Sequence, residues 1–176
     1  MSFLLLLLLA ACGSPVVPPP TTSPAPTSAA PTCPEPGVAI TTGVVSAAMG
    51  LRAMTVELRN CGTADFPLDG YPEVRVLDED KDQLPITIGH GDQGVPTGTE
   101  WDDPPQPLVL HPGERARAGL VWRNTLTDGP PAVGRYLVIA PLAGQPGQTV
   151  EDGPDQPPVN IDLGSTGKLG VQAWRR

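Results

Sequence analysis

The segment RAMTVELRN, Arg52–Asn60, alternates apolar and polar residues from its third position onward. Met54, Val56 and Leu58 fall on one side of an extended chain, and the polar residues between them fall on the other. The segment ERARAGLVWRN, Glu114–Asn124, repeats this alternation with arginines on its polar side. A period of two residues is typical of a β-strand that is buried on one face only. Both segments therefore predict strands with one buried and one solvated face.

Seven other short runs are rich in β-forming residues, and turn residues separate them. Asp69-Gly70, Pro112-Gly113 and Asp128-Gly129 are such turns. The chain has 24 prolines and 20 glycines and no sustained helical period, which argues against long helices. We predict an all-β fold, an immunoglobulin-like antiparallel β-sandwich of about eight or nine short strands with Trp122 and Trp174 in its core. The predicted strands are residues 38–45, 52–60, 72–78, 84–90, 107–110, 114–124, 135–141, 159–163 and 168–174.

The first residues form an apolar run that ends at a cysteine. Phe3–Ala11 is nine residues long, whereas a helix needs about 20 to span a bilayer, so the run fits the apolar part of an export signal. Leu9-Ala10-Ala11-Cys12 resembles the bacterial lipobox, and this resemblance implies that the Cys12 thiol is acylated. No lysine or arginine precedes Phe3, which departs from the usual signal. The alternative is an ordinary signal peptide with a chance cysteine.

A linker separates this signal from the predicted domain. Residues 13–32 are dominated by proline, serine, threonine and alanine and carry no charge, which predicts an extended spacer. We divide the chain into a lipoprotein signal peptide (residues 1–11), a lipidated cysteine with its linker (residues 12–34) and a β-sandwich domain (residues 35–176). Because two or more acyl chains anchor a protein stably, we expect it on the extracytoplasmic face of the cell membrane.

Two cysteines remain once Cys12 is acylated, and both belong to the exported part of the chain. Thiols oxidise outside the cytoplasm, so we predict a disulfide between Cys33 and Cys61. It would contribute about 3.5 kcal/mol in the chain-entropy description of disulfides. The alternatives are two free thiols and a thiol pair that binds a metal ion.

The net charge excludes one class of partner. The chain carries −8 at pH 7, and no run of lysines or arginines interrupts it. A protein that binds nucleic acid needs a cationic footprint to release counterions, so nucleic acid is not an expected partner. Anionic lipid headgroups are repelled for the same reason, and membrane attachment must come through the lipid.

Two longer segments resemble a known family. LRNCGTADFPLDGYPEVRVLDEDKDQL, residues 58–84, followed by LVLHPGERARAGLVWRN, residues 108–124, is similar to the domain of unknown function 4232, found in exported proteins and lipoproteins of actinobacteria. The resemblance covers about Cys33 to Pro141 and implies an exported β-sandwich with no known activity. The points of similarity are Asn60, Leu68–Pro72, Val74, Val76 and Leu110–Gly113.

The motifs that could carry chemistry are incomplete. Asp78-x-Asp80-x-Asp82 alternates carboxylates as a calcium loop does, but Gln83 stands where that loop needs glycine. A solvated hairpin turn is therefore favoured. His90 and His111 are the only histidines, and their spacing does not make them converge, so we predict neither a metal site nor a cofactor. Neither serine of the domain lies in a nucleophile motif, and we do not expect an enzyme.

A long connection is the main candidate for a functional surface. Gly89–Pro107 spans 19 residues without a strand pattern, and connections of that length are usually binding loops or disordered segments. Trp101 lies among carboxylates, so we expect it to be exposed, and tryptophan is favoured at interface hot spots. The alternatives are an insertion without function and a mixed metal site that includes Glu100. The candidate binding residues are His90, Asp92, Trp101, Asp102 and Asp103.

These features together predict a lipid-anchored, monomeric envelope protein. Its domain is expected to act as a binding or interaction module for an unknown ligand or envelope protein. The alternatives are a structural accessory of a membrane complex and a hydrolase of undetected type. A pocket that joins His90, Trp101 and Asp102 would favour binding, whereas a flat apolar patch would favour the accessory.

Overall fold

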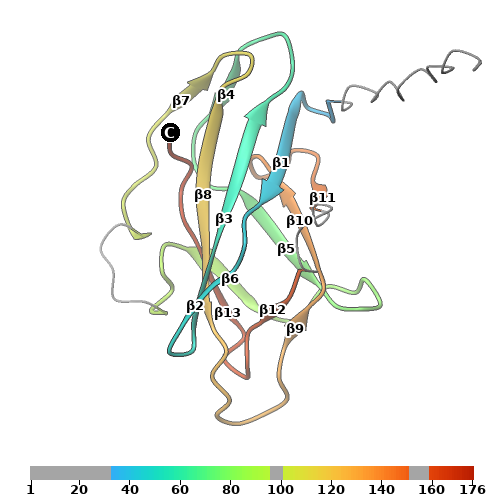
Figure 1. Cartoon of the computed structure of the whole chain (residues 1–176), viewed down its shortest axis with the longest axis vertical. Helices are drawn as coiled ribbons and strands as arrows, with labels where there is room; N and C mark the ends of the chain where they lie inside the picture. The colour runs from blue at the N-terminus through green and yellow to red at the C-terminus, as the bar shows by residue number, and fades with distance from the viewer. Residues whose placement is uncertain (1–32, 96–100, 151–158) are drawn as a thin grey trace, which may run out of the picture. The chain divides into compact units, whose positions relative to one another are not determined.

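Two layers of β-sheet make up the part of the chain that the structure describes. A computed structural model describes residues 33–95, 101–150 and 159–176 (Figure 1). The predicted signal peptide, Cys12, most of the predicted linker and Glu100 lie outside the described residues. Within those described ranges, no helix is long and apolar enough to cross a membrane.

Thirteen strands occur in the described residues, and they belong to one larger sheet and three smaller ones. The larger sheet contains β1 (Val38–Thr42), β2 (Ser46–Ala48), β3 (Leu51–Asn60), β6 (Thr87–His90), β8 (Arg115–Arg123) and β13 (Lys168–Val171). The smaller sheets contain β4 (Phe66–Leu68), β5 (Glu73–Leu77), β7 (Leu108–Leu110), β9 (Val133–Gly134), β10 (Tyr136–Ala140), β11 (Gln148–Val150) and β12 (Ile161–Asp162).

The larger sheet is built around the long antiparallel pair β3 and β8. The strand order is β1-β3-β8-β13-β6, and β2 also pairs with β3. The ladder between β3 and β8 runs without interruption from the pair Leu51–Arg123 to the pair Arg59–Arg115. β8 pairs with one side of β3, and both β1 and the short β2 pair with its other side. At the other edge, β13 pairs with β6 in parallel.

The second layer is the three-stranded sheet β11-β10-β5, which packs against the six-stranded sheet (Figure 1). Gln148 of β11 ties the two layers together at the edge strand β1. Its side-chain oxygen accepts a hydrogen bond from the Ile40 amide at 3.1 Å, and its side-chain nitrogen donates to the Val38 carbonyl at 2.8 Å. A strand that ends a sheet leaves backbone groups unpaired, and this glutamine satisfies one donor and one acceptor of β1.

The core lies between the two layers and uses alternate residues of β3 and β8. Trp122 is fully buried and Trp174 is 1% exposed, as predicted. The indole nitrogen of Trp174 donates to the Pro141 carbonyl at 2.7 Å, whereas that of Trp122 has no partner among the described residues. Each full burial of a large apolar side chain contributes about 1.5–3 kcal/mol. The alternating core residues of the pair are Met54, Val56, Leu58, Ala116, Ala118, Leu120 and Trp122.

The predicted fold class, an all-β sandwich, is confirmed. All nine predicted runs contain a strand, but the described residues hold 13 strands because β2, β4, β9 and β11 were not predicted. Each of these four has only two or three residues, too few to display a period of two. The parallel pair of β6 and β13 also departs from a wholly antiparallel arrangement.

The predicted disulfide between Cys33 and Cys61 is present, with the two Cα atoms 5.5 Å apart. The alternatives of free thiols and of a metal-binding thiol pair are therefore wrong. The bond joins the residues just before β1 to the end of β3. The amides of Cys61 and Gly62 reinforce this junction because both donate to the Gly37 carbonyl, at 3.2 and 2.9 Å.

Candidate functional site

The outer face of the six-stranded sheet carries most of the polar side chains of β3 and β8. Strand register places Thr55 opposite Gly119, Glu57 opposite Arg117, and Arg59 opposite Arg115. The exposed side of the pair therefore changes along its length. One half presents small residues, and the other half presents a group of arginines around a single glutamate.

Glycines on neighbouring strands let a loop segment lie flat on this outer face. Gly170 of β13 lies beside Gly89 of β6. A β-carbon at Gly170 would lie 2.5 Å from the Gly91 carbonyl oxygen, and one at Gly89 would collide with the Gln93 side chain. Glycine inside a strand often marks such a close approach of another backbone. Residues 91–95 can cover this edge because both positions lack a side chain.

The covering segment is held in place by hydrogen bonds. The Arg123 Nε donates to the Val95 carbonyl at 2.9 Å, and Val95 itself is buried. The Asp92 amide donates to the Asp102 carboxylate at 3.0 Å. This last bond joins two parts of the predicted binding loop that are ten residues apart. Residues 91–95 are therefore packed on the sheet, whereas most of residues 102–107 are exposed. The first residues of the loop, Gly89 and His90, belong to β6.

Trp101 packs on the same face, above Gly119 of β8. A β-carbon at Gly119 would lie 2.6 Å from the Trp101 Cη2 atom, so the indole occupies the space where another residue would place its side chain. Trp101 is half-buried. The expectation that it would be exposed is therefore wrong, because Gly119, 18 positions later in the chain, leaves the space in which the indole packs.

A depression of about 340 Å³ opens beside Trp101 on this face. Thr55 and Gly119 lie on its floor, and Trp101 is part of its wall. Among the described residues that line it there are three arginines, Arg117, Arg175 and Arg176, and no aspartate or glutamate. We call this depression the arginine trough.

The arginine trough continues into a second depression, of about 370 Å³, toward β1. The two depressions share Thr55 and Arg117. The second is lined by the polar side chains of Thr41, Thr42 and Glu57. Together they provide room along the face for a ligand longer than one small group.

Ion pairs hold the trough arginines but leave a positive excess. Glu57 pairs with Arg115 at 3.2 Å through one oxygen and with Arg117 at 3.3 Å through the other. One carboxylate thus faces two guanidinium groups. Arg175 pairs with Asp103 at 3.2 Å, and Arg176 pairs with Glu114 at 3.5 Å. A guanidinium has five N–H donors, so Arg117 retains donors for a ligand while it contacts Glu57.

The predicted binding residues have different positions in the structure. Of the five, only Trp101 lines the arginine trough. Asp102 fastens the covering segment, and Asp103 positions Arg175. His90 is separate from the trough and stacks on Tyr71, with ring centroids 3.7 Å apart and planes 2° from parallel. The structure thus groups Trp101 with arginines rather than with His90 and Asp102.

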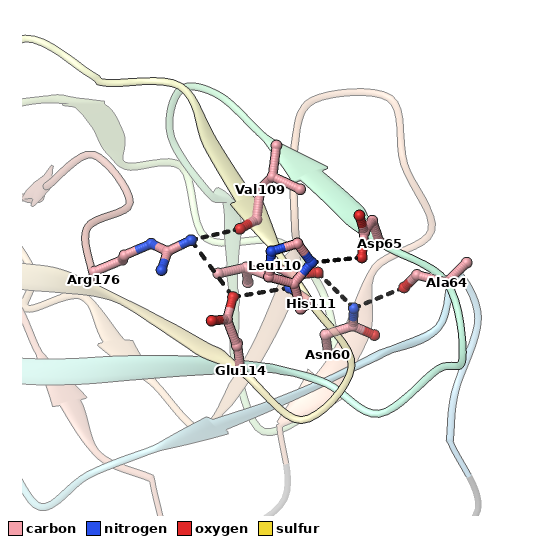
Figure 2. Close-up of polar contacts among 8 residues, drawn as sticks. All are labelled: Asn60, Ala64, Asp65, Val109, Leu110, His111, Glu114 and Arg176. Carbon is pink, nitrogen blue, oxygen red and sulfur yellow. Dashed lines mark hydrogen bonds and ion pairs between the residues drawn. The ribbon is translucent and has the colours of Figure 1, made fainter.

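A second polar cluster lies at the end of the sheet that carries the disulfide (Figure 2). Asn60 is the one buried polar side chain among the described residues. Its side-chain nitrogen donates to the carbonyls of Ala64 at 2.9 Å and Leu110 at 2.7 Å, and its oxygen accepts from the Gly62 amide at 3.0 Å. Because burying an unpaired amide costs free energy, these bonds make Asn60 a structural junction between β3 and β7.

His111 lies at the surface of this cluster (Figure 2). Its Nδ1 atom is 2.8 Å from the Asp65 carboxylate, and its amide donates to Glu114 at 2.9 Å. The bond to Asp65 raises the pKa of His111 above the ordinary value of 6.5, and the charges of Asp65 and Glu114 act in the same direction. Arg176 donates to the Val109 carbonyl at 2.6 Å and brings the last residue to the same place.

The acidic segment Asp78–Asp82 forms a turn between β5 and the residues that follow it. The Asp78 carboxylate accepts from the amides of Asp80 at 3.0 Å and Asp82 at 2.9 Å. An aspartate that bonds the backbone two residues ahead is a common turn device. The predicted solvated hairpin turn agrees with this geometry.

Sequence reasoning did not find the arginine trough. Arg117 stands in a predicted strand, while Arg175 and Arg176 lie at the other end of the domain sequence, and a non-local sheet pairing brings them together. The glycines Gly119 and Gly170 were the available signal. A glycine inside a strand points to a segment that packs closely on it.

The fold and the site define a β-sandwich domain with a basic trough on the outer face of its larger sheet. Residues 33–175 match the domain of unknown function DUF4232, and the chain belongs to this family. The predicted membership of this family is therefore confirmed, and the match extends past Pro141 to Arg175. Neither the curated proteins nor the solved structures contain a match to this chain.

Proposed function

We propose that this protein is a lipid-anchored cell-envelope protein whose domain is a binding or interaction module. Its binding surface is the arginine trough with the adjoining depression. The ligand or partner lies outside the cytoplasm, because the domain is carried there by the export signal.

Two features support export and anchoring. The lipobox-like residues Leu9–Cys12 end the apolar N-terminal run, which supports acylation of the Cys12 thiol. The Cys33–Cys61 disulfide supports an oxidising compartment, because such bonds are rare in the cytoplasm.

One observation carries the binding role. In a chain of net charge −8, the arginine trough is lined by three arginines and a half-buried tryptophan, with no carboxylate among its described lining residues. Arginine and tryptophan are the residues most enriched at binding hot spots. Side chains that only solubilise the surface do not need this concave arrangement around Trp101.

Photo-crosslinking in intact cells tests the binding role. A photoreactive amino acid at Thr55 would stand on the trough floor, and the same group at Thr149 of β11 would stand on the other sheet. Both positions are exposed threonines in strands, so they form a matched pair. We expect a specific crosslinked species from Thr55 that is absent from Thr149. Equal patterns from the two positions, or none from Thr55, would contradict the proposal.

Detergent partitioning tests the anchor separately. The unchanged protein should enter the detergent phase, and Cys12→Ala should leave the protein in the aqueous phase. A Cys12→Ala protein that still enters the detergent phase would show that the lipobox interpretation is wrong.

An accessory role in a membrane complex is the second candidate, supported by a different surface. Val45 is 38% exposed and Met49 is fully exposed, on either side of the short edge strand β2. Exposed apolar groups of this kind can mark a protein contact. Crosslinking from Met49 rather than from Thr55 would favour this role.

A further inference from the structure

We propose that the arginine trough binds an acidic carbohydrate, a glycan whose sugar rings carry carboxylate groups. This inference rests on the proposed binding role and adds the chemical class of the ligand.

The sign of the charge selects an anionic ligand. Arg117, Arg175 and Arg176 line the trough, whereas their carboxylate partners lie outside its lining, with Glu57 in the adjoining depression. The partners of Arg175 and Arg176 are Asp103 and Glu114. Guanidinium groups match the geometry of carboxylates with two parallel hydrogen bonds. The chain as a whole carries −8, so the arginines of the trough are a local positive excess that attracts an anion.

The sheet backbone argues against an extended peptide as the ligand. The trough lies on the face of the pair β3 and β8, whose ladder is continuous along nine residue pairs. Peptides that bind to sheets add a strand at an edge, where backbone groups are free. On this face the backbone groups are already paired within the sheet, so side chains alone must recognise the ligand.

The side chains of the trough suit a sugar. Thr55 and Ser46 contribute hydroxyl groups, Gln172 contributes an amide, and Trp101 contributes an aromatic ring. Hydroxyl and amide groups can both donate and accept hydrogen bonds, as sugar hydroxyls do. The negative face of an aromatic ring attracts the weakly positive C–H groups of a sugar ring.

The length of the surface suits more than one sugar unit. The trough and the adjoining depression share Thr55 and Arg117, and the second part adds the hydroxyls of Thr41 and Thr42. It also adds the Glu57 carboxylate, which is paired with the guanidinium groups of Arg115 and Arg117. An oligosaccharide that places a carboxylate near Arg117 would extend into both parts. We therefore expect an oligomer to bind more tightly than the single acidic sugar.

Binding can be measured by fluorescence with the full chain in a non-ionic detergent. Trp122 and Trp174 are buried in the core, so a change in tryptophan emission on binding should come from Trp101. The probes are tetragalacturonate, the uncharged galactose tetramer with the same linkage, a tetraglutamate peptide and inorganic phosphate. We expect tetragalacturonate to bind most tightly and added salt to weaken its binding.

Two substitutions locate the site, each with a matched control. Arg117→Gln should weaken tetragalacturonate binding at least about ten-fold, since a hydrogen bond to a charged group is lost. Arg135→Gln removes the same charge beside β10 of the other sheet and should leave binding unchanged. Thr55→Glu places a carboxylate on the trough floor and should weaken binding far more than Thr55→Gln, which has nearly the same size and no charge. Thr55 is exposed, so these two variants keep the fold.

The outcomes separate this inference from the proposed function. Equal binding of the uncharged tetramer, or tighter binding of tetraglutamate or phosphate, would overturn the acidic-carbohydrate class. No binding of tetragalacturonate, together with a specific crosslink from Thr55 in cells, would overturn this inference and leave the binding role intact. If tetragalacturonate does not bind and Thr55 gives no specific crosslink in cells, both proposals are overturned.

Discussion

The two faces of strands β3 and β8 come from alternate residues of the same two segments, but they depend on the rest of the chain in different ways. The inner face is apolar at every position that meets the core, and it is buried by the second layer. The outer face acquires its shape from remote residues, because Trp101 and Arg175 reach it from other parts of the sequence. Local alternation thus determines where the core lies. The site on the opposite face requires the assembled sheet.

The largest difference between the two faces should appear in stability. Leu58 is fully buried on the inner face, so Leu58→Ala should lower the free energy of unfolding by about 2–5 kcal/mol. The adjacent outer residue provides the control, because Arg59→Ala should change stability by less than about 0.5 kcal/mol. Chemical denaturation measures both. Similar losses from the two variants would contradict the assignment of the faces.

The glycines of the outer face should produce the next largest effect. A β-carbon at Gly170 would meet the backbone of Gly91 and Asp92, whereas one at Gly119 would meet the side chains of Trp101 and Gln172. A backbone moves less easily than a side chain, so Gly170→Ala should lower the free energy of unfolding by about 1–3 kcal/mol. Gly119→Ala should lower the free energy of unfolding by less, and it should instead displace the Trp101 side chain.

Acrylamide quenching distinguishes the two glycine variants. Gly119→Ala should increase quenching, because Trp101 would be displaced from its seat while the other two tryptophans stay in the core. Unchanged quenching in this variant would mean that the position of the Trp101 indole does not require glycine at residue 119. It would contradict the close contact between these two residues.

The same contrast explains which features could be predicted from the sequence. The alternation of Met54, Val56 and Leu58 was sufficient for the inner face, and Cys33 and Cys61 were sufficient for the disulfide. Trp101 was recognised as part of a surface. Its exposure was predicted wrongly because the space above Gly119 in which it packs forms only in the assembled sheet.

The basic character of the site was also hidden in the sequence. No run of more than two arginines occurs, since Arg117 is flanked by alanines and the pair Arg175-Arg176 follows the last strand. The pairing of β13 with β8 brings these arginines together. Period and composition are local properties, so neither reports a charge cluster that depends on sheet topology.

A smaller effect concerns the arginines that face each other on the outer side. Arg59 and Arg115 occupy directly opposite positions, and like charges in such pairs reduce stability. Arg59→Glu should therefore raise the free energy of unfolding by about 0.2–1 kcal/mol, and the gain should shrink at high salt. A loss of stability at low salt would show that this repulsion is absent. A gain would indicate that repulsion between Arg59 and Arg115 destabilises the outer face, whereas the apolar inner face has no such repulsion.

The smallest effect belongs to the exposed pair of His111 and Asp65, at the end of the sheet. Since the folded state raises the pKa of His111 above 6.5, the protonated imidazole favours folding. This contribution is fully present below pH 6.5 and is lost as the pH rises through the raised pKa.

Titration by NMR should give a His111 pKa above 6.5, and Asp65→Asn should lower it, because Asp65 supplies both the hydrogen bond and the nearest charge. The stability difference between the unchanged protein and His111→Gln should be larger at acidic than at alkaline pH. A pKa at or below 6.5 would contradict the contact shown in Figure 2. Because both side chains are more than half exposed, salt should weaken the effect, in contrast to the losses expected from the inner face.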